Sequence, residues 1–457
     1  MSAQKLIVGH LTDFHARQAI HGSAAVLARR SRDIFDLLPE AIDILKTQGV
    51  NFLAITGDLV DVPTFILSPD DYYQTPLDDW LPSVRADYEQ LKEILDSSGL
   101  PYMVLPGNHD YEPIFWQVFE KVPLYYDIEQ GYRLVRFCDR EWAGHIPRRF
   151  DRERKLWEKM LADEKSPPQI HLQHYVIKPE LNEGYPHTYF EGESLKAQNT
   201  ASGRVILSLS GHYHRGTDLI SQDGCHFAVG PAFCEFPHPF RIYEIEDRQV
   251  NMHTLTLLKR PHQAGRKVVF LDRDGVINDA PSYNTGPEAL ALIPGAGEAI
   301  LKLRQAGYAV VVNTSQSCVG LGYVSRETIN TVHERMCQLL VGETGNHMAQ
   351  PDAIFFSTEA GKKAVHPTLV DHALAKPSPA LLQQAETLLA LNPQNAWMVG
   401  DRLSDLQAGL AYGATPILVR TGAGRQTENA LKQKDIAGLV ICDNLVNAVN
   451  HILSRIE

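Results

Sequence analysis

The sequence contains few cysteines and no long apolar run. Its 457 residues include six cysteines, none of them in a CxxC pair, so neither a disulfide framework nor a cysteine-ligated zinc site is indicated. No stretch of about 18 apolar residues is present. The N-terminus lacks both the basic start and the apolar core of a signal peptide. We therefore expect a cytoplasmic protein that makes no contact with a membrane.

Positive charge is also in deficit, with 43 Lys and Arg against 55 Asp and Glu and a formal net charge of −12. General binding to the nucleic acid backbone requires clustered cations and is therefore not expected. Small phosphorylated substrates remain open, because bound metal ions can supply positive charge locally. The chain length favours two or three domains, and the oligomeric state is not indicated.

Short apolar runs alternate with helical patterns along most of the chain, which predicts an α/β fold. We expect one domain over residues 1–257, a polar linker over 258–266 and a second domain over 267–457. Strands are expected at "KLIVGHL", "FLAITGD", "YMVLPGN", "QIHLQHY" and "RVILSLSGH" in the first domain. Residues 220–256 resemble hairpins, which would close this domain with antiparallel strands. The second domain is predicted to be a βαβ series with a parallel sheet.

Polar side chains follow the expected strands of the first half. In chain order they are Asp13, His15, Asp58, Asp61, Asn108, His109, His174, His212 and His214. Because α/β sheets bind ligands at the carboxyl ends of their strands, we expect these side chains to share one site. Carboxylate, imidazole and amide ligands suit Mn, Fe, Zn or Ni, and a pair of such ions can promote in-line hydrolysis of a phosphoester.

The segments "TDFH", "TGDLVD", "PGNHD", "LQHY" and "SGHYH" resemble the calcineurin-like metallophosphoesterases over residues 5–256. The resemblance implies an αββα sandwich with two divalent transition metals. One metal would be bound by Asp13, His15 and His214, the other by Asn108, His174 and His212, with Asp58 between them. His109 would protonate the leaving oxygen, and Asp61 would orient His109.

Some positions in this half leave alternatives open. His171 shares a segment with His174, and we select His174 because it stands at the end of the strand. Asp110 is compatible with a plain helix N-cap. Protein Ser/Thr phosphatases of this superfamily carry a phosphate-gripping Arg directly after Asp61, where this chain has Val62, so that substrate class is not expected.

An insertion over residues 62–90 is rich in aromatic and acidic residues. It is either a surface loop with a helix or a cap that places Tyr72, Tyr73 or Trp80 against a base or sugar. The second interpretation would suit a phosphodiester of modest, nucleotide-like size.

The second half resembles the haloacid dehalogenase superfamily, and "LDRDGVIN" is close to its histidinol-phosphate and heptose-bisphosphate phosphatase branch. The resemblance covers residues 267–424, includes "LDRDG", "NTSQS", "AKPSP" and "VGDRLSD", and implies a Rossmann-like doubly wound sheet. By this resemblance the site residues are Asp272 as nucleophile, Asp274 as general acid and base, Thr314 or Ser315 for the phosphate, Lys376 as the neutralising cation, and Asp272, Asp274 and Asp401 for Mg²⁺. Asp405 would be a supporting carboxylate.

The substrate-gripping residues of that branch are missing. Leu321 and Ala375 stand where arginines are expected. The cysteine-rich zinc loop is also absent, and we interpret His366 and His372 as ordinary loop residues. A bisphosphorylated heptose or histidinol phosphate is therefore not the expected substrate. We hypothesise a bifunctional phosphoesterase in which a diesterase precedes a monoesterase. The alternatives are two independent monoesterases on small metabolites, or an active first half joined to a second half that senses a ligand or dimerises.

Overall fold

The computed structural model describes residues 4–21, 28–67, 80–183, 185–258, 264–279, 286–365, 373–431, 436 and 438–455. These residues form two compact units, one running up to residue 258 and the other from residue 264 onward, with His21 grouped with the second. Each unit has its own hydrophobic cores. No helix among the described residues is long and apolar enough to cross a membrane.

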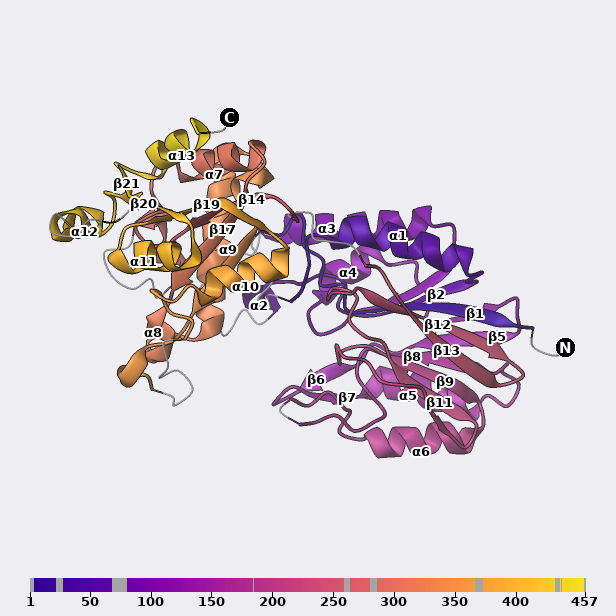
Figure 1. Cartoon of the computed structure of the whole chain (residues 1–457). Helices are drawn as coiled ribbons and strands as arrows, with labels where there is room; N and C mark the ends of the chain where they lie inside the picture. The colour runs from indigo at the N-terminus through magenta and orange to yellow at the C-terminus, as the bar shows by residue number, and fades with distance from the viewer. Residues whose placement is uncertain are drawn as a thin grey trace. The chain divides into compact units, whose positions relative to one another are not determined.

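The first unit is built around two sheets (Figure 1). The five-stranded sheet has the order β13 (Gln249–Thr256), β12 (Pro239–Glu246), β1 (Leu6–Leu11), β2 (Phe52–Thr56) and β3 (Tyr102–Leu105). The six-stranded sheet has the order β10 (Ile220–Gln222), β11 (Cys225–Val229), β9 (Val205–Ser210), β8 (Gln169–Leu172), β5 (Tyr132–Arg136) and β4 (Tyr125–Ile128). Apolar side chains from both sheets, among them Val8, Leu105 and Leu207, form one buried cluster.

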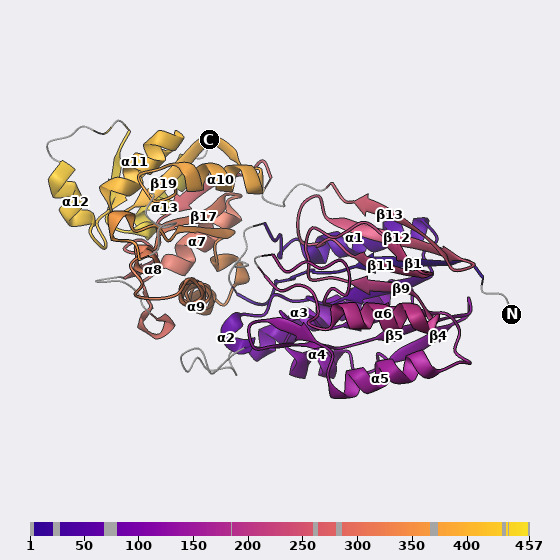
Figure 2. The ribbon, with the colours of Figure 1, turned by 90° about the horizontal axis from the view of Figure 1, so that it is seen from below.

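The helices of this unit lie outside its two sheets. They are α1 (Ile34–Thr47), α2 (Thr64–Leu67), α3 (Leu81–Ser97), α4 (Glu112–Val118), α5 (Asp151–Ala162) and α6 (Gly192–Ser202), and a hairpin of β6 (Arg140–Trp142) and β7 (Ile146–Arg148) precedes α5. Trp157 of α5 and Leu195 of α6 pack with Val135 and Phe227 on the six-stranded sheet. Burial of each large apolar side chain contributes ~1.5–3 kcal/mol. Figure 2 gives the unit turned by 90°.

The sandwich confirms the predicted α/β class and the five expected strands. The strands that precede the polar site residues run parallel to one another within each sheet, so their carboxyl ends lie at a common edge. Strands β12 and β13 form the expected antiparallel hairpin beside β1. Strands β10 and β11 also form an antiparallel hairpin, and the other edge of β11 pairs parallel to β9, which was not expected. Strands β4 to β7 were not expected from the sequence, since they are short and carry charged or exposed residues.

The second unit has one parallel six-stranded sheet, with a separate two-stranded ladder of β15 (Asn278–Asp279) and β16 (Ala291–Leu292). Its order is β18 (Ala353–Ser357), β17 (Ala309–Ser315), β14 (Lys267–Leu271), β19 (Asn392–Gly400), β20 (Thr415–Val419) and β21 (Val440–Cys442). Every pairing in the six-stranded sheet is parallel, which confirms the doubly wound class.

Helices pack on both faces of this sheet (Figure 1). They are α7 (Ala296–Gln305), α8 (Ser317–Gly320), α9 (Arg326–Thr344), α10 (Ala380–Leu389), α11 (Leu403–Tyr412), α12 (Gly424–Leu431) and α13 (Leu445–Leu453), with short 3₁₀ turns at Pro287–Ala289, His347–Ala349 and Gly361–Lys363. Helices α7, α9 and α13 share one core cluster, and α10 and α11 share the other. Local signals define some ends, since the Ser325 hydroxyl accepts from Thr328 N at the start of α9 and Gly345 ends it in the left-handed region.

Candidate active sites

Three ligand-type side chains meet at the carboxyl ends of β1 and β9. Ligand atoms of Asp13, His15 and His214 all lie within 4.8 Å of one another. Nε2 of His15 is 3.2 Å from Nε2 of His214, and Nε2 of His214 is 3.6 Å from Oδ1 of Asp13. These are the three residues that the sequence resemblance assigns to one metal.

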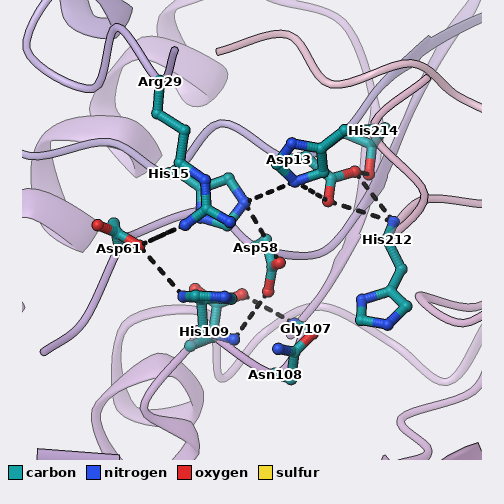
Figure 3. A network of polar contacts seen from close by, with 12 residues as sticks. Asp13, His15, Arg29, Asp58, Asp61, Gly107, Asn108, His109, His212 and His214 are labelled. Carbon is teal, nitrogen blue, oxygen red and sulfur yellow. Dashed lines mark hydrogen bonds and ion pairs between the residues drawn. The ribbon is translucent and has the colours of Figure 1, made fainter. Parts of the chain in front are cut away.

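A second group lies next to the first (Figure 3). Ligand atoms of Asp58, His174 and His212 lie within 4.8 Å of one another, and Nε2 of His174 is 3.0 Å from Oδ1 of Asn108. Oδ2 of Asp58 is 3.4 Å from Nε2 of His15 and 3.4 Å from Nε2 of His174. Asp58 therefore lies between the two ligand groups, where a carboxylate can be shared.

The backbone around these side chains is unusual. Asp13, His15, Asp58 and His212 all have positive φ, at 53°, 44°, 51° and 67°. Non-glycine residues adopt this region rarely, and such strain persists where the surrounding structure enforces it, often at functional sites. Gly107 is required for a close approach, because a Cβ at this position would lie 2.2 Å from Oδ1 of Asp58.

The donor set fits two divalent cations. Nε2 of His212 is buried and has no hydrogen-bond partner among the residues that the structure describes. Nδ1 of His174 donates to the carbonyl oxygen of Thr56 at 2.8 Å, which leaves the lone pair of Nε2 for a metal. Burial alone would lower the pKa of His174, but the Asp58 carboxylate raises it to about 9. The site thus attracts positive charge, which bound cations would supply.

His109 and Asp61 form a separate pair at the edge of this site. Nδ1 of His109 is 3.1 Å from Oδ1 of Asp61, and the His109 side chain is 31% exposed. Although burial opposes it, Arg17 and His109 hold the pKa of Asp61 well below its usual range. The ionised Asp61 carboxylate orients the His109 ring.

Asp110 is not the helix cap that the sequence allowed. The N-cap of α4 is Tyr111, and Asp110 is buried. Its carboxylate accepts hydrogen bonds from the backbone N–H groups of Leu59, Val60 and Gly107 and from the Tyr88 hydroxyl, at 2.8–3.2 Å. Asp110 therefore ties the loop after β2 to the loop after β3, which carry Asp58 and Asn108.

Other expectations for this half have mixed outcomes. Nε2 of His171 is 2.8 Å from Oε1 of Gln169, so this buried ring serves the core while His174 faces the site. Trp80 is 1% exposed and cannot stack on a substrate, so it does not serve the cap that was one of the two interpretations of residues 62–90. Tyr72 and Tyr73 lie outside the described residues.

In the second unit, three carboxylates and one ammonium group meet at the carboxyl ends of β14 and β19. Ligand atoms of Asp272, Asp401 and Asp405 lie within 4.8 Å of one another. Nζ of Lys376 is 2.7 Å from Oδ1 of Asp272 and 2.5 Å from Oδ1 of Asp405. The nucleophile, cation and metal-binding aspartate proposed from the sequence are therefore neighbours, and Asp405 joins them more closely than expected.

This cluster also fits a divalent cation. Burial raises the pKa of Asp272 to about 7 and that of Asp401 to about 6, although Lys376 opposes both shifts. Oδ1 of Asp401 is buried without a hydrogen-bond partner. A Cβ on Gly275 would lie 2.3 Å from Oδ2 of Asp401, so only glycine permits this approach. Three carboxylates face one ammonium group, and this excess of negative charge suits Mg²⁺.

Asp274 and Thr314 are linked through a residue to which the sequence gave no role. Nε2 of Gln316 donates to Oδ2 of Asp274 at 2.9 Å and to the Thr314 hydroxyl at 2.8 Å. Arg273 and Asn278 also donate to the Asp274 carboxylate. Gln316 lies within the quoted "NTSQS" motif, so its position was visible even though its contacts were not.

The comparisons with known proteins agree with this geometry. A family model for calcineurin-like phosphoesterases matches residues 6–216, and a family model described as HAD-hydrolase-like matches residues 373–448. A curated relative, the D-glycero-beta-D-manno-heptose-1,7-bisphosphate 7-phosphatase of Pseudomonas putida, is 37% identical over 164 residues. The alignment covers 35% of this chain and 86% of the relative.

Two solved structures are also similar. The D,D-heptose 1,7-bisphosphate phosphatase of B. bronchiseptica, complexed with magnesium and phosphate, is 30% identical, and the match covers 42% of this chain and 99% of that one with a TM-score of 0.37. A dimetal phosphatase from Danio rerio is 14% identical, with 56% and 100% covered and a TM-score of 0.42.

The two family matches fall in different halves of the chain, at residues 6–216 and 373–448. The model matched by the N-terminal half is that of phosphoesterases, and the curated relative is a phosphatase. The N-terminal half thus matches the calcineurin-like phosphoesterases, the chain belongs to the HAD-like hydrolases through its C-terminal half, and it is an enzyme that hydrolyses phosphoric ester bonds.

Proposed function

We propose that the N-terminal site cleaves a phosphodiester and that the C-terminal site removes the terminal phosphate that results. The observation that carries this proposal is the presence of two complete hydrolytic sets of different mechanism. Asp58 lies between two ligand groups in the first unit, and Lys376 joins Asp272 to Asp405 in the second. A product that keeps a terminal phosphate links the two reactions chemically.

In the N-terminal site, water attacks phosphorus while the bond to the leaving oxygen breaks. Asp13, His15, Asp58, Asn108, His174, His212 and His214 would hold two divalent cations. Such ions activate water and neutralise phosphoryl oxygens. His109 donates a proton to the leaving alkoxide, and the Asp61 carboxylate orients its ring. The candidate metals for this site are Mn, Fe, Zn and Ni.

In the C-terminal site, a carboxylate oxygen of Asp272 attacks phosphorus and forms an aspartyl-phosphate as the ester bond breaks. Asp274 gives a proton to the leaving alkoxide, then takes one from the water that hydrolyses the intermediate. Lys376 offsets the negative charge of Asp272 and the phosphoryl group. Mg²⁺, held by Asp272, Asp401 and the main chain at Asp274, would supply Lewis acidity.

The C-terminal substrate is proposed to be a small phosphomonoester other than the bisphosphorylated heptose named for the relatives. Ala375 is 6% exposed, so a buried methyl group occupies one position where an arginine clamp was expected. Leu321, half-buried after α8, occupies the other. Neither side chain can pair with a second phosphate.

A row of rings beside His212 favours a planar group on the N-terminal substrate. The ring centroids of Tyr185 and His187 are 5.7 and 5.0 Å from that of His212, and His187 is 5.1 Å from Tyr213. These half-buried rings are a different source of stacking from the cap considered in the sequence. They support a nucleotide-like diester, because bases stack on aromatic faces.

The test uses bis(p-nitrophenyl) phosphate with Mn²⁺ and Mg²⁺ and follows nitrophenol and inorganic phosphate. The wild type is expected to release both. Asp272→Asn should release one nitrophenol and accumulate p-nitrophenyl phosphate, whereas Asp58→Asn should leave the diester intact. An equimolar mixture of the two variants should release phosphate more slowly than the wild type, because the tether raises the effective concentration of the intermediate.

Other outcomes would select the alternatives. If the N-terminal site turns over only monoesters, the chain carries two independent monoesterases. If phosphate release survives Asp272→Asn but not Asp58→Asn, the C-terminal half is non-catalytic in this reaction, as a sensing or dimerisation module would be. Loss of both activities through a single substitution would contradict the division of labour.

A further inference from the structure

Arg29 is an arginine at the N-terminal site that no motif of the sequence singled out. It belongs to the short segment before α1, and its side chain is 9% exposed. Nη1 of Arg29 is 3.0 Å from Oδ1 of Asp61 (Figure 3). Its backbone forms an antiparallel bridge with Glu235, which fixes the segment beside the loop that follows β11. The guanidinium is therefore held in place from two directions.

The Asp61 carboxylate does not neutralise this guanidinium by itself. Nη2 of Arg17 is 3.1 Å from Oδ2 of Asp61, and Nε of Arg17 donates to the Asp61 carbonyl oxygen at 2.8 Å. One carboxylate thus faces two arginines as well as His109. Among the described residues, no other carboxylate lies within 4 Å of Arg29. The Asp61 carboxylate is therefore shared, and the buried guanidinium of Arg29 has room for a second anionic partner.

The unused donors of Arg29 have the geometry for such an anion. Nε is buried without a hydrogen-bond partner, and Nη2 donates no hydrogen bond to any residue in the described ranges. Nε and Nη2 form one edge of the planar guanidinium, and this edge can donate two parallel hydrogen bonds to a phosphoryl group. The third nitrogen, Nη1, remains on Asp61.

The location of Arg29 matches the reaction centre. Oδ1 of Asp61, which pairs with Nη1 of Arg29, is also 3.1 Å from Nδ1 of His109 and 3.4 Å from Nδ1 of His15. Arg29 therefore contacts the same carboxylate as His15, a candidate metal ligand, and His109, the proposed proton donor. The position directly after Asp61, where an arginine would otherwise grip phosphate, is Val62 at 2% exposure.

We propose that Arg29 binds the phosphoryl group of the substrate in the N-terminal site and takes the place of the arginine that is missing after Asp61. This assignment rests on the proposed phosphoesterase function of that site. Arg29 is far from Asp61 in sequence, so a different segment of the chain supplies the positive charge that an arginine after Asp61 would supply.

The experiment uses the full chain with Asp272→Asn, so that the C-terminal nucleophile is absent. Arg29→Gln and Arg29→Lys are compared in this background for KM and kcat on bis(p-nitrophenyl) phosphate and for the inhibition constant of inorganic phosphate. Arg29→Gln should raise KM and the inhibition constant about 10- to 100-fold, the range for a hydrogen bond to a charged group. Arg29→Lys should give a smaller increase, because it keeps the charge but loses the planar fork.

A second readout does not depend on turnover. Inorganic phosphate should raise the thermal unfolding midpoint of the Mn²⁺-loaded parent chain by ligand linkage, and this shift should shrink in Arg29→Gln at equal metal content. Arg32→Gln is the control on the same segment, since Arg32 donates to the carbonyl oxygens of Gln18 and Ile20. It should leave KM and the phosphate-induced shift unchanged.

The outcomes separate this proposal from the function on which it rests. If Arg29→Gln lowers kcat with KM, phosphate inhibition and the thermal shift unchanged, Arg29 only positions Asp61 and the proposal is wrong. If Arg29→Gln does not fold, the Arg29→Lys comparison decides in the same way. If the parent chain hydrolyses no phosphoester while phosphate still shifts its unfolding through Arg29, the proposed function fails and the binding role stands.

Discussion

Oε1 of Glu235 lies 2.6 Å from Nδ1 of His214. This contact fixes the ring of His214 with Nε2 toward Asp13 and His15. Carboxylate partners of this kind orient a ligating histidine and raise its basicity. Glu235 comes from the loop after β11, some twenty residues beyond the motif that contains His214, so the relationship exists only in the folded chain.

Replacement of Glu235 by Gln is expected to weaken metal binding in the N-terminal site about 10- to 100-fold, because the His214 ring loses its carboxylate partner. Competition with a chelator, followed by metal analysis, measures this affinity directly. Glu193→Gln is a suitable control, since Glu193 is an exposed residue of α6 paired with Lys196. An unchanged affinity in Glu235→Gln would show that Glu235 has no positioning role.

His109→Gln should lower kcat for diesters according to their leaving group. We expect a decrease of about 10²-fold to 10⁴-fold for an alkyl leaving group, which needs a proton, and a much smaller decrease for p-nitrophenol. Steady-state kinetics on the two substrate types with matched metal content measure the ratio. Equal losses on both would argue against proton donation by His109 and for a purely structural contact with Asp61.

Gln316→Ala is predicted to reduce monoesterase activity without loss of the fold. It removes the donor shared by Thr314 and Asp274, so both side chains gain freedom at the C-terminal site. We expect kcat to fall by about 10-fold or more, since a small misplacement of reacting groups is costly. Gln383→Ala, on helix α10, is the comparison variant. Retention of full activity in Gln316→Ala would mean that Arg273 and Asn278 suffice to hold Asp274.

Acid should destabilise the first unit through His10, which is 1% exposed on β1. Burial, with a further contribution from the Arg241 charge, lowers the pKa of His10 to about 3. In the unfolded chain the same group titrates near 6.5. The pKa of His10 is therefore lower in the folded chain than in the unfolded chain. The contribution of the neutral ring to the free energy of unfolding is fully present above pH 6.5 and is lost as the pH falls toward 3.

The loss from His10 approaches about 1.4 kcal/mol per pH unit within that window. Thermal unfolding at pH 7.5 and 5.5 measures it. His10→Gln should lower stability at pH 7.5 and make the midpoint less sensitive to acidification than in the wild type. His253, which is exposed on β13, is a matched position for the control His253→Gln. Identical acid sensitivity in wild type and His10→Gln would contradict this account.

The sequence by itself determined the α/β class, the paired phosphoesterase families and the segments that carry the site residues. These features are local, because a strand with a polar residue at its end is visible in a few consecutive letters. The relative placement of Asp13, Asp58 and His174 followed from the rule that parallel strands share an edge. The roles of the individual site residues remain predictions for the experiments above.

Tertiary structure decided what no local pattern encodes. Asp110 proved to tie two loops together, since its partners lie in a segment some fifty residues earlier. Trp80 proved to be buried, because its environment depends on the packing of α3 and not on the polar residues beside it in sequence. The contacts of Glu235 with His214 and of Arg29 with Asp61 join separate segments of the chain. Such contacts form only when the chain folds, so the sequence supplied the side chains and the fold determined their partners.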